Sequence, residues 1–205
     1  FGTPDGQGIG ANSLFWRVGG DIGMNGTWRF GAYRVDGETG GRVTEEGTIT
    51  FIGDTDLKAY DIRYTYAPTG NENSQEFTLT AEHFTRNENG TYGATGDEAF
   101  ATAAYDGTTR GYYIAATYKW MPQARMGLRY SEMTNVNLVG ALDGTAVDGA
   151  GFKPTQMNVM FDWTNSEYSR IRLQLGQEKR SAGNNDDQII LQYIMSFGAH
   201  GAHKY

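Results

Sequence analysis

Arginine and lysine side chains occur at alternate positions in several short runs of the chain. Arg170 and Arg172, for example, flank a single aliphatic residue. Alternate side chains of an extended strand point to the same face, so both guanidinium groups would lie on one face. Fixed cations that line a narrow space lower the energy of an anion within it. The candidate set of such cations is Arg63, Lys119, Arg125, Arg129, Arg170 and Arg172.

The alternative for each of these cations is a structural ion pair. Asp61, Glu76, Glu82 and Asp162 follow the same alternation, so cross-strand pairs that only fill an interior stay open. The other acidic residues occur mainly in stretches rich in glycine and asparagine, where no spacing matches a calcium-binding loop. We expect these acids to be solvated loop charge.

Metal and catalytic motifs are weak. His200 and His203 are spaced like some zinc ligands, but residues three apart in an extended strand point to opposite faces. Only a turn at Gly201 would bring them together, so they are weak metal candidates. No Ser-His-Asp arrangement is recognisable, and the glycine-rich stretch after Asp5 lacks the strand and helix of a phosphate-binding loop. We expect no metal site, no cofactor and no enzyme activity.

Composition excludes further classes. The chain has 205 residues, no cysteine, and 24 acidic against 17 basic residues. The absence of cysteine excludes a disulfide scaffold, a thiolate metal site and a cysteine nucleophile. An acidic chain is a poor nucleic-acid binder, since that affinity comes from neutralised phosphates. With 13% aromatic and 20% charged residues the chain is expected to fold.

Period-two alternation is the strongest regularity. In Tyr60–Tyr66 the large side chains fall on one face and Asp61 and Arg63 on the other. Comparable runs occur at Glu76–Thr85, Tyr112–Trp120, Arg125–Ser131, Gln156–Trp163, Ser169–Leu175 and Ile189–Phe197, with weaker ones at Ser13–Val18 and Thr27–Val35. These runs predict an all-β chain of about nine to ten strands, without an amphipathic helix.

The connections between these runs are expected to alternate in length. Short links occur at Met24–Gly26, Trp120–Gln123 and Thr164–Glu167, with an intermediate one at Ala67–Ser74. Longer links occur at Asp36–Glu46, Asn87–Arg110, Asn135–Lys153 and Arg180–Asp187. Counted along the chain, the short links fall at one end of the sheet and the long links at the other.

This pattern is typical of an outer-membrane barrel, with tight turns on one side and longer loops on the other. Tyr66, Trp120 and Trp163 at strand ends fit an aromatic girdle. A soluble sandwich or lipocalin-like barrel is the alternative, because its strands alternate too. The fold we expect is an antiparallel up-and-down transmembrane β-barrel, with residues 1–205 as a single domain.

The C-terminal part adds a resemblance. KPTQMNVMFDWTNSEYSRIRLQLGQEK and DDQIILQYIMSFGAHGAHKY resemble the ends of porin-like outer-membrane proteins of Gram-negative bacteria, described as relatives of phosphate-selective porins or as zinc-regulated TonB-dependent receptors. Weaker likeness extends back through TYKWMPQARMGLRY to GGDIGMNGTWRFGAYR. The resemblance implies that the chain is the C-terminal part of a longer barrel. No stretch looks like a TonB box or plug.

The final strand suits insertion by the barrel-assembly machinery, for which a terminal aromatic residue is the usual mark. Tyr193, Phe197 and Tyr205 share one parity and would all face lipid; a plain edge strand with a tail is the alternative. The other expected partners are the lipid bilayer, lipopolysaccharide and small solutes or anions, and a homo-oligomer stays open.

The expected function is a porin-like channel in the bacterial outer membrane, through which small hydrophilic solutes pass passively with a preference for anions. The alternatives are a TonB-dependent-type receptor for metal or metal complexes, and a structural barrel with a filled lumen. Barrel width would discriminate between an open and a filled lumen.

Overall fold

The computed structural model describes residues 10–43, 47–94, 101–136, 138–166 and 168–196. Across these residues nine strands form one sheet, accompanied by a short 3-10 turn, η1 (Gly140–Leu142). No helix in this part of the chain is long and apolar enough to cross a membrane. The strands are β1 (Ala11–Ile22), β2 (Gly26–Val43), β3 (Ile49–Tyr66), β4 (Glu76–Ala94), β5 (Thr102–Met121), β6 (Ala124–Thr134), β7 (Thr155–Ser166), β8 (Ser169–Ser181) and β9 (Asn184–Met195).

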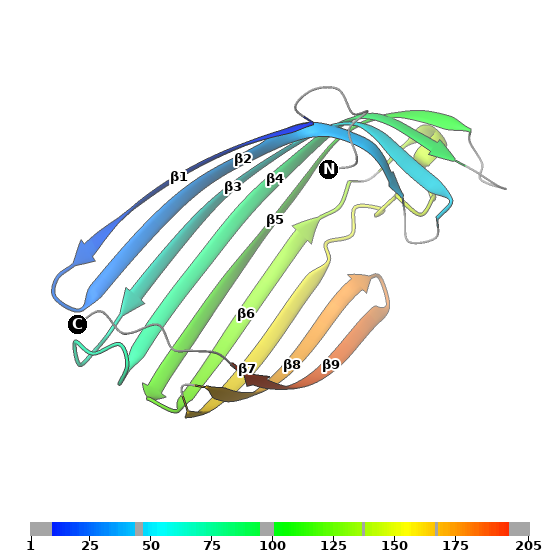
Figure 1. Cartoon of the computed structure of the whole chain (residues 1–205). Coiled ribbons are helices and arrows are strands. Elements are labelled where there is room, and N and C mark those ends of the chain that lie inside the picture. Colours follow the sequence, from blue (N-terminus) through cyan, green and yellow to red (C-terminus); the bar gives the residue numbers. More distant parts are fainter. Residues whose placement is uncertain (1–9, 44–46, 95–100, 137, 167, 197–205) are drawn as a thin grey trace.

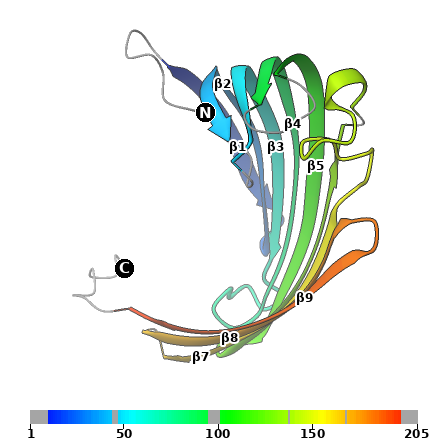
Figure 2. The same ribbon diagram turned by 90° about the vertical axis from the view of Figure 1, so that its right-hand side faces the viewer.

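The topology is a simple meander. Each strand pairs antiparallel with its neighbours in sequence, in the order β1 to β9 (Figure 1). The sheet bends into a trough and does not close on itself, so in the described part β1 and β9 are its edges (Figure 2). The expected all-β, up-and-down antiparallel fold is confirmed, and the open sheet is compatible with part of a barrel.

The two faces of the sheet differ in chemistry, as the alternation predicts. Ile62, Leu128 and Leu173 lie on one face and remain 39 to 50% exposed. Asp61 and Asp162, on the opposite face, are nearly covered by their neighbours. Side chains on the inner face of a bent sheet converge, whereas those on the outer face spread apart. The polar side chains therefore line the concave face and the apolar ones the convex face.

Several strands are longer than the sequence predicts. The stretch Asn87–Arg110, expected as a long link, is mostly strand: β4 and β5 remain paired as far as Gly93 and Thr102. Similarly, β2 continues to Val43 through most of the link expected at Asp36–Glu46. Neighbouring strands satisfy the backbone groups of these Gly-, Asn- and Thr-rich stretches, so pairing overrides their weak strand propensity.

The prediction of a long link at Arg180–Asp187 is also wrong. β8 runs to Ser181 and β9 starts at Asn184, so residues 182 and 183 alone form the turn. Gly183 has a φ of 83°, a backbone conformation that tight hairpin turns often require. The predicted contrast between short and long connections therefore fails for most links. It holds for the segment between β6 and β7.

This β6–β7 segment, residues 135–154, packs against the sheet. Leu142 in η1 is 4% exposed and packs with the buried side chains of Ile49, Phe51, Tyr92 and Tyr105 from β3, β4 and β5. The register places these four residues on the same face as Asp61. The segment therefore covers the concave face near one end of the sheet, where it forms the molecule's small apolar core.

Candidate functional site: the arginine-rich concave face

A single carboxylate organises the concave face of β6, β7 and β8. Asp162 lies directly opposite Arg125 on one side and Arg172 on the other. Arg172 donates through Nε and Nη2 to its two oxygens at 2.7 and 3.0 Å, and Arg125 Nη2 donates at 2.5 Å. Arg170 Nη1 lies 3.8 Å away. We call these four residues the Asp162 cluster; one negative charge is shared by three guanidinium groups.

The remaining predicted cations have different surroundings. Arg63 is exposed and forms no ion pair with any residue that the structure describes. Arg129 lies over the ring of Tyr113, with its guanidinium carbon 4.3 Å from the ring centre. Lys119 donates to the backbone carbonyl of Glu72 at 2.7 Å. All three share the concave face with the Asp162 cluster, but the structure brings none of them into that cluster.

Arg63 has a second cation beside it. Arg29 on β2 lies directly opposite Arg63 in the ladder, and its Nη2 is 3.4 Å from the buried carboxylate of Asp61. Like charges directly opposite each other are unfavourable unless a counter-charge is near. Asp61 compensates Arg29, so Arg63 is a surplus cation of this part of the face.

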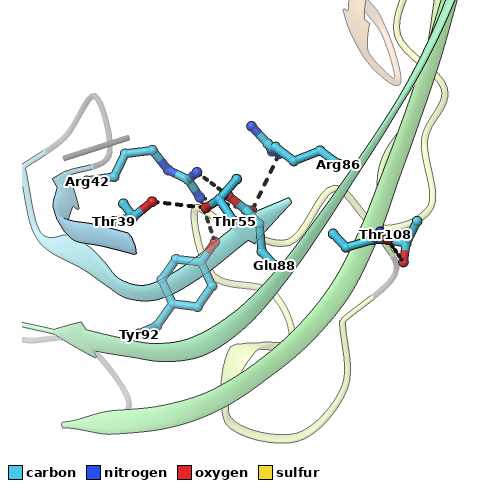
Figure 3. Close-up of polar contacts among 8 residues, drawn as sticks. Thr39, Arg42, Thr55, Arg86, Glu88, Tyr92 and Thr108 are labelled. Carbon is cyan, nitrogen blue, oxygen red and sulfur yellow. Dashed lines mark hydrogen bonds and ion pairs between the residues drawn. The ribbon is translucent and has the colours of Figure 1, made fainter. Parts of the chain in front are cut away.

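A second carboxylate hub lies near the β6–β7 segment. Glu88 on β4 has a side chain that is 2% exposed and that accepts from both Nη1 and Nη2 of Arg42. Thr55 Oγ1 lies 3.4 Å and Arg86 Nε 3.5 Å from its oxygens. Figure 3 shows Arg42 and Arg86 approaching Glu88 from different directions. We call Arg42, Thr55, Arg86 and Glu88 the Glu88 cluster; here two cations share one anion.

Tyrosine rings extend the Glu88 cluster toward the β6–β7 segment. The Tyr92 hydroxyl lies 3.5 Å from Arg42 Nη2, and the Tyr92 and Tyr105 rings meet edge to face at 5.1 Å. Tyr105 lies over Gly107, where an added Cβ would lie 2.2 Å from its hydroxyl oxygen. Glycine at this position therefore lets the ring lie flat along β5, beside the residue pair Glu88–Gly107.

The β6–β7 segment is held in shape by a carboxylate of its own. Asp148 accepts backbone N–H groups from Leu138 at 3.0 Å, Gly144 at 3.1 Å and Ala150 at 2.9 Å. These three hydrogen bonds favour the ionised carboxylate and lower the pKa of Asp148 below its ordinary value. Together with the Leu142 anchor, they give the segment a defined position over the sheet.

A cleft of about 720 Å³ separates the β6–β7 segment from the sheet. Arg86, Tyr105 and Thr109 line its sheet side, and residues 146–152 line the opposite side. Residues 180–182, at the end of β8 and the start of the β8–β9 turn, complete it. Residues distant in sequence thus surround one space beside the Glu88 cluster. Its lining mixes guanidinium groups, hydroxyls and aromatic rings, which suits a small polar solute with an apolar part.

Sequence reasoning missed the Glu88 cluster and this cleft. It assigned Glu88 to loop charge and ended the strand at Thr85. The parity of Glu82 continues through Arg86, Glu88 and Tyr92, and this continued alternation is the signal that could have extended the strand. The arrangement of the β6–β7 segment has no comparable sequence signal.

Of the C-terminal residues singled out from the sequence, Tyr193 alone lies in the described part of the chain. Tyr193 lies on the convex face and is 63% exposed, which agrees with its predicted parity. Phe197, Tyr205, His200 and His203 lie outside the described residues. Among the residues that are described, no three His, Asp or Glu side chains are grouped in a way that could hold a metal ion.

The concave face therefore combines two buried carboxylates, each shared by several arginines, with surplus cations between them. Such a face can attract and guide anions without chemical change. Compared with known proteins, the chain matches no protein-family model and no curated protein.

Proposed function

We propose that this chain forms part of the wall of an outer-membrane pore through which small hydrophilic solutes pass, with a preference for anions. The observation that carries the proposal is the opposite chemistry of the two faces of one bent antiparallel sheet. An exposed apolar surface spans β1 to β9, whereas the concave face carries the Asp162 cluster and the unpaired Arg63. A water-soluble protein would leave such an apolar surface without a partner.

The convex face has the layered order that a bilayer requires. On β3, Tyr60, Ile62 and Tyr66 lie on the convex face. Toward the start of β3, the next residues on this face are charged, first Lys58 and then Asp56. On β5 the apolar stretch is Tyr112–Trp120, and a tilted transmembrane strand crosses the hydrocarbon core with about 9 to 11 residues. An outer-membrane barrel presents a band of about 25 Å, bounded by aromatic residues.

The concave face supplies the preference for anions. Arg63 has no acidic partner in the described part of the chain, and each of the two carboxylate clusters holds more guanidinium groups than carboxylates. Arginine remains charged at any accessible pH, so the excess is permanent. In a narrow space bounded by low-dielectric walls, such an excess lowers the energy of a passing anion.

The cellular part of the proposal follows from the same surface. A convex apolar band contacts the acyl chains of the outer membrane, and charged residues above it reach the level of lipopolysaccharide. Insertion by the barrel-assembly machinery, using a final strand that contains Tyr193, belongs to this proposal as well.

The test is ion selectivity of the full-length native protein in planar bilayers. Under a gradient of potassium chloride, the double variant Arg63→Gln/Arg129→Gln should shift the reversal potential toward cations, most clearly at low salt, where screening is weakest. Arg34→Gln is the matched control, because Arg34 lies on the opposite face and pairs with Asp56 at 3.0 Å. An unchanged reversal potential would contradict the preference for anions, and absence of conductance would favour a filled structural barrel.

A further inference from the structure

We infer that the cleft between the β6–β7 segment and strands β4 and β5 is a binding site for small organic monocarboxylates with an aromatic or alicyclic body. The inference deepens the proposed function, on which it rests, by naming a class of solute and the place where it binds first. It is carried by three features of the cleft: a spare cationic donor, neighbouring apolar rings, and a position beyond the apolar band.

Arg86 supplies the spare donor. Its Nε is buried and lies 3.5 Å from Glu88, but the side chain as a whole is 41% exposed, and its two terminal nitrogens form no hydrogen bond with any described residue. Both oxygens of Glu88 are taken by Arg42, which does not line the cleft. Glu88 is thus already compensated, and the Arg86 guanidinium, which lines the cleft, can bind a further carboxylate.

The charges around the cleft favour one carboxylate over two. Arg180, the other arginine at its edge, has its own partners, with Glu178 at 3.1 Å and Asp186 at 3.8 Å. Asp148 also lines the space and would repel a second negative charge on the solute. A monoanion therefore fits better than a dicarboxylate or a phosphate dianion.

The rest of the lining fits an apolar body. Tyr92 and Tyr105 line the sheet side with the ring edges that their 6 and 9% exposure leaves accessible, Val147 packs beside them, and Phe152 lines the cleft from the β6–β7 segment. Thr109 adds a hydroxyl. The Phe152 ring and the accessible edges of the two tyrosines would contact the apolar body of a solute, while Arg86 fixes the carboxylate end.

The position of the cleft suits a site where an entering solute binds first. On β3 the convex face becomes charged beyond Tyr60, and Arg86 pairs with Leu57, beyond that boundary. The cleft thus lies beyond the apolar band. Figure 2 shows the β6–β7 segment at this end of the sheet. A solute entering from this end meets Arg86 before it reaches Arg63 and the Asp162 cluster.

The test measures equilibrium binding by the full-length protein in detergent, so it does not depend on conductance. Sodium benzoate is titrated by calorimetry, with benzyl alcohol as its uncharged counterpart. The Arg86→Gln variant should bind benzoate about tenfold more weakly, the loss of one charge-assisted hydrogen bond. Arg34→Gln, on the opposite face, should bind like the parent.

A second variant keeps the test valid if Arg86→Gln folds poorly. Ala146→Trp adds a large side chain to the lining of the cleft without removing any of its charges, and it should also abolish benzoate binding. Equal affinity for benzyl alcohol and benzoate would overturn the inference in favour of neutral solutes. No benzoate binding at millimolar concentrations would overturn it as well, even in a protein that conducts anions. Benzoate binding without any conductance would instead contradict the proposed pore.

Discussion

Replacing Asp162 with asparagine tests how the concave face is held together. The Asp162 side chain is 2% exposed and accepts three hydrogen bonds from Arg125 and Arg172, with Arg170 as a further neighbour. The substitution keeps the shape of the side chain but leaves three guanidinium groups without an anion. Removing one partner of a buried ion pair costs about 3 to 5 kcal/mol.

The three arginines retain 24 to 40% of their side-chain exposure, so water compensates part of this loss. We therefore expect Asp162→Asn to lower the free energy of unfolding by about 3 kcal/mol, the lower end of that range. Combining it with Arg125→Gln should be less than additive, because the second change removes one of the cations left uncompensated.

The assay is urea unfolding of the full-length protein in lipid vesicles, followed by tryptophan fluorescence. Asp186→Asn is the matched control, because Asp186 is half exposed and lies 3.8 Å from Arg180. An exposed pair of this kind contributes about 0 to 1 kcal/mol. If both variants lose the same small amount, the Asp162 cluster is not the structural hub that its geometry indicates.

Three further predictions concern the β6–β7 segment and the convex face. Leu142→Ala should detach residues 135–154 from the sheet, at a local cost of about 2 to 5 kcal/mol, and hydrogen exchange should rise in that segment while β6–β9 stay protected. Because hydrogen bonds lower the pKa of Asp148 in the folded state, its contribution is present above the ordinary pKa and is lost as pH falls through the lowered one. Protease cleavage of the segment should therefore rise at strongly acidic pH in the parent, whereas Asp148→Asn should be cleaved readily at neutral pH. Leu128→Arg, within the apolar band, should destabilise the protein in vesicles by about 2 to 4 kcal/mol, whereas Thr91→Arg, on the same face beyond the band, should have little effect; equal effects would contradict a membrane-facing band.

The sequence by itself determined which residues share a face. A strand has a side-chain period of two, so the parity of Arg125, Arg129, Arg170 and Arg172 follows once each run is recognised as a strand. The same reasoning separated Ile62 and its neighbours from the polar side chains, and it predicted the antiparallel all-β fold. These conclusions need only local information, which is why they could be drawn without the structure.

The tertiary structure alone decided which charges meet. The register places Asp162 between Arg125 and Arg172, and a shift by two residues would keep every face assignment but change those partners. The extension of β4 through Glu88 depended on ladder partners in β3 and β5 that override weak local propensity. The fold of residues 135–154 depended on contacts between Leu142 and three other strands, which no local pattern encodes. The cleft beside Arg86 exists because these long-range contacts extend β4 and hold the β6–β7 segment beside it.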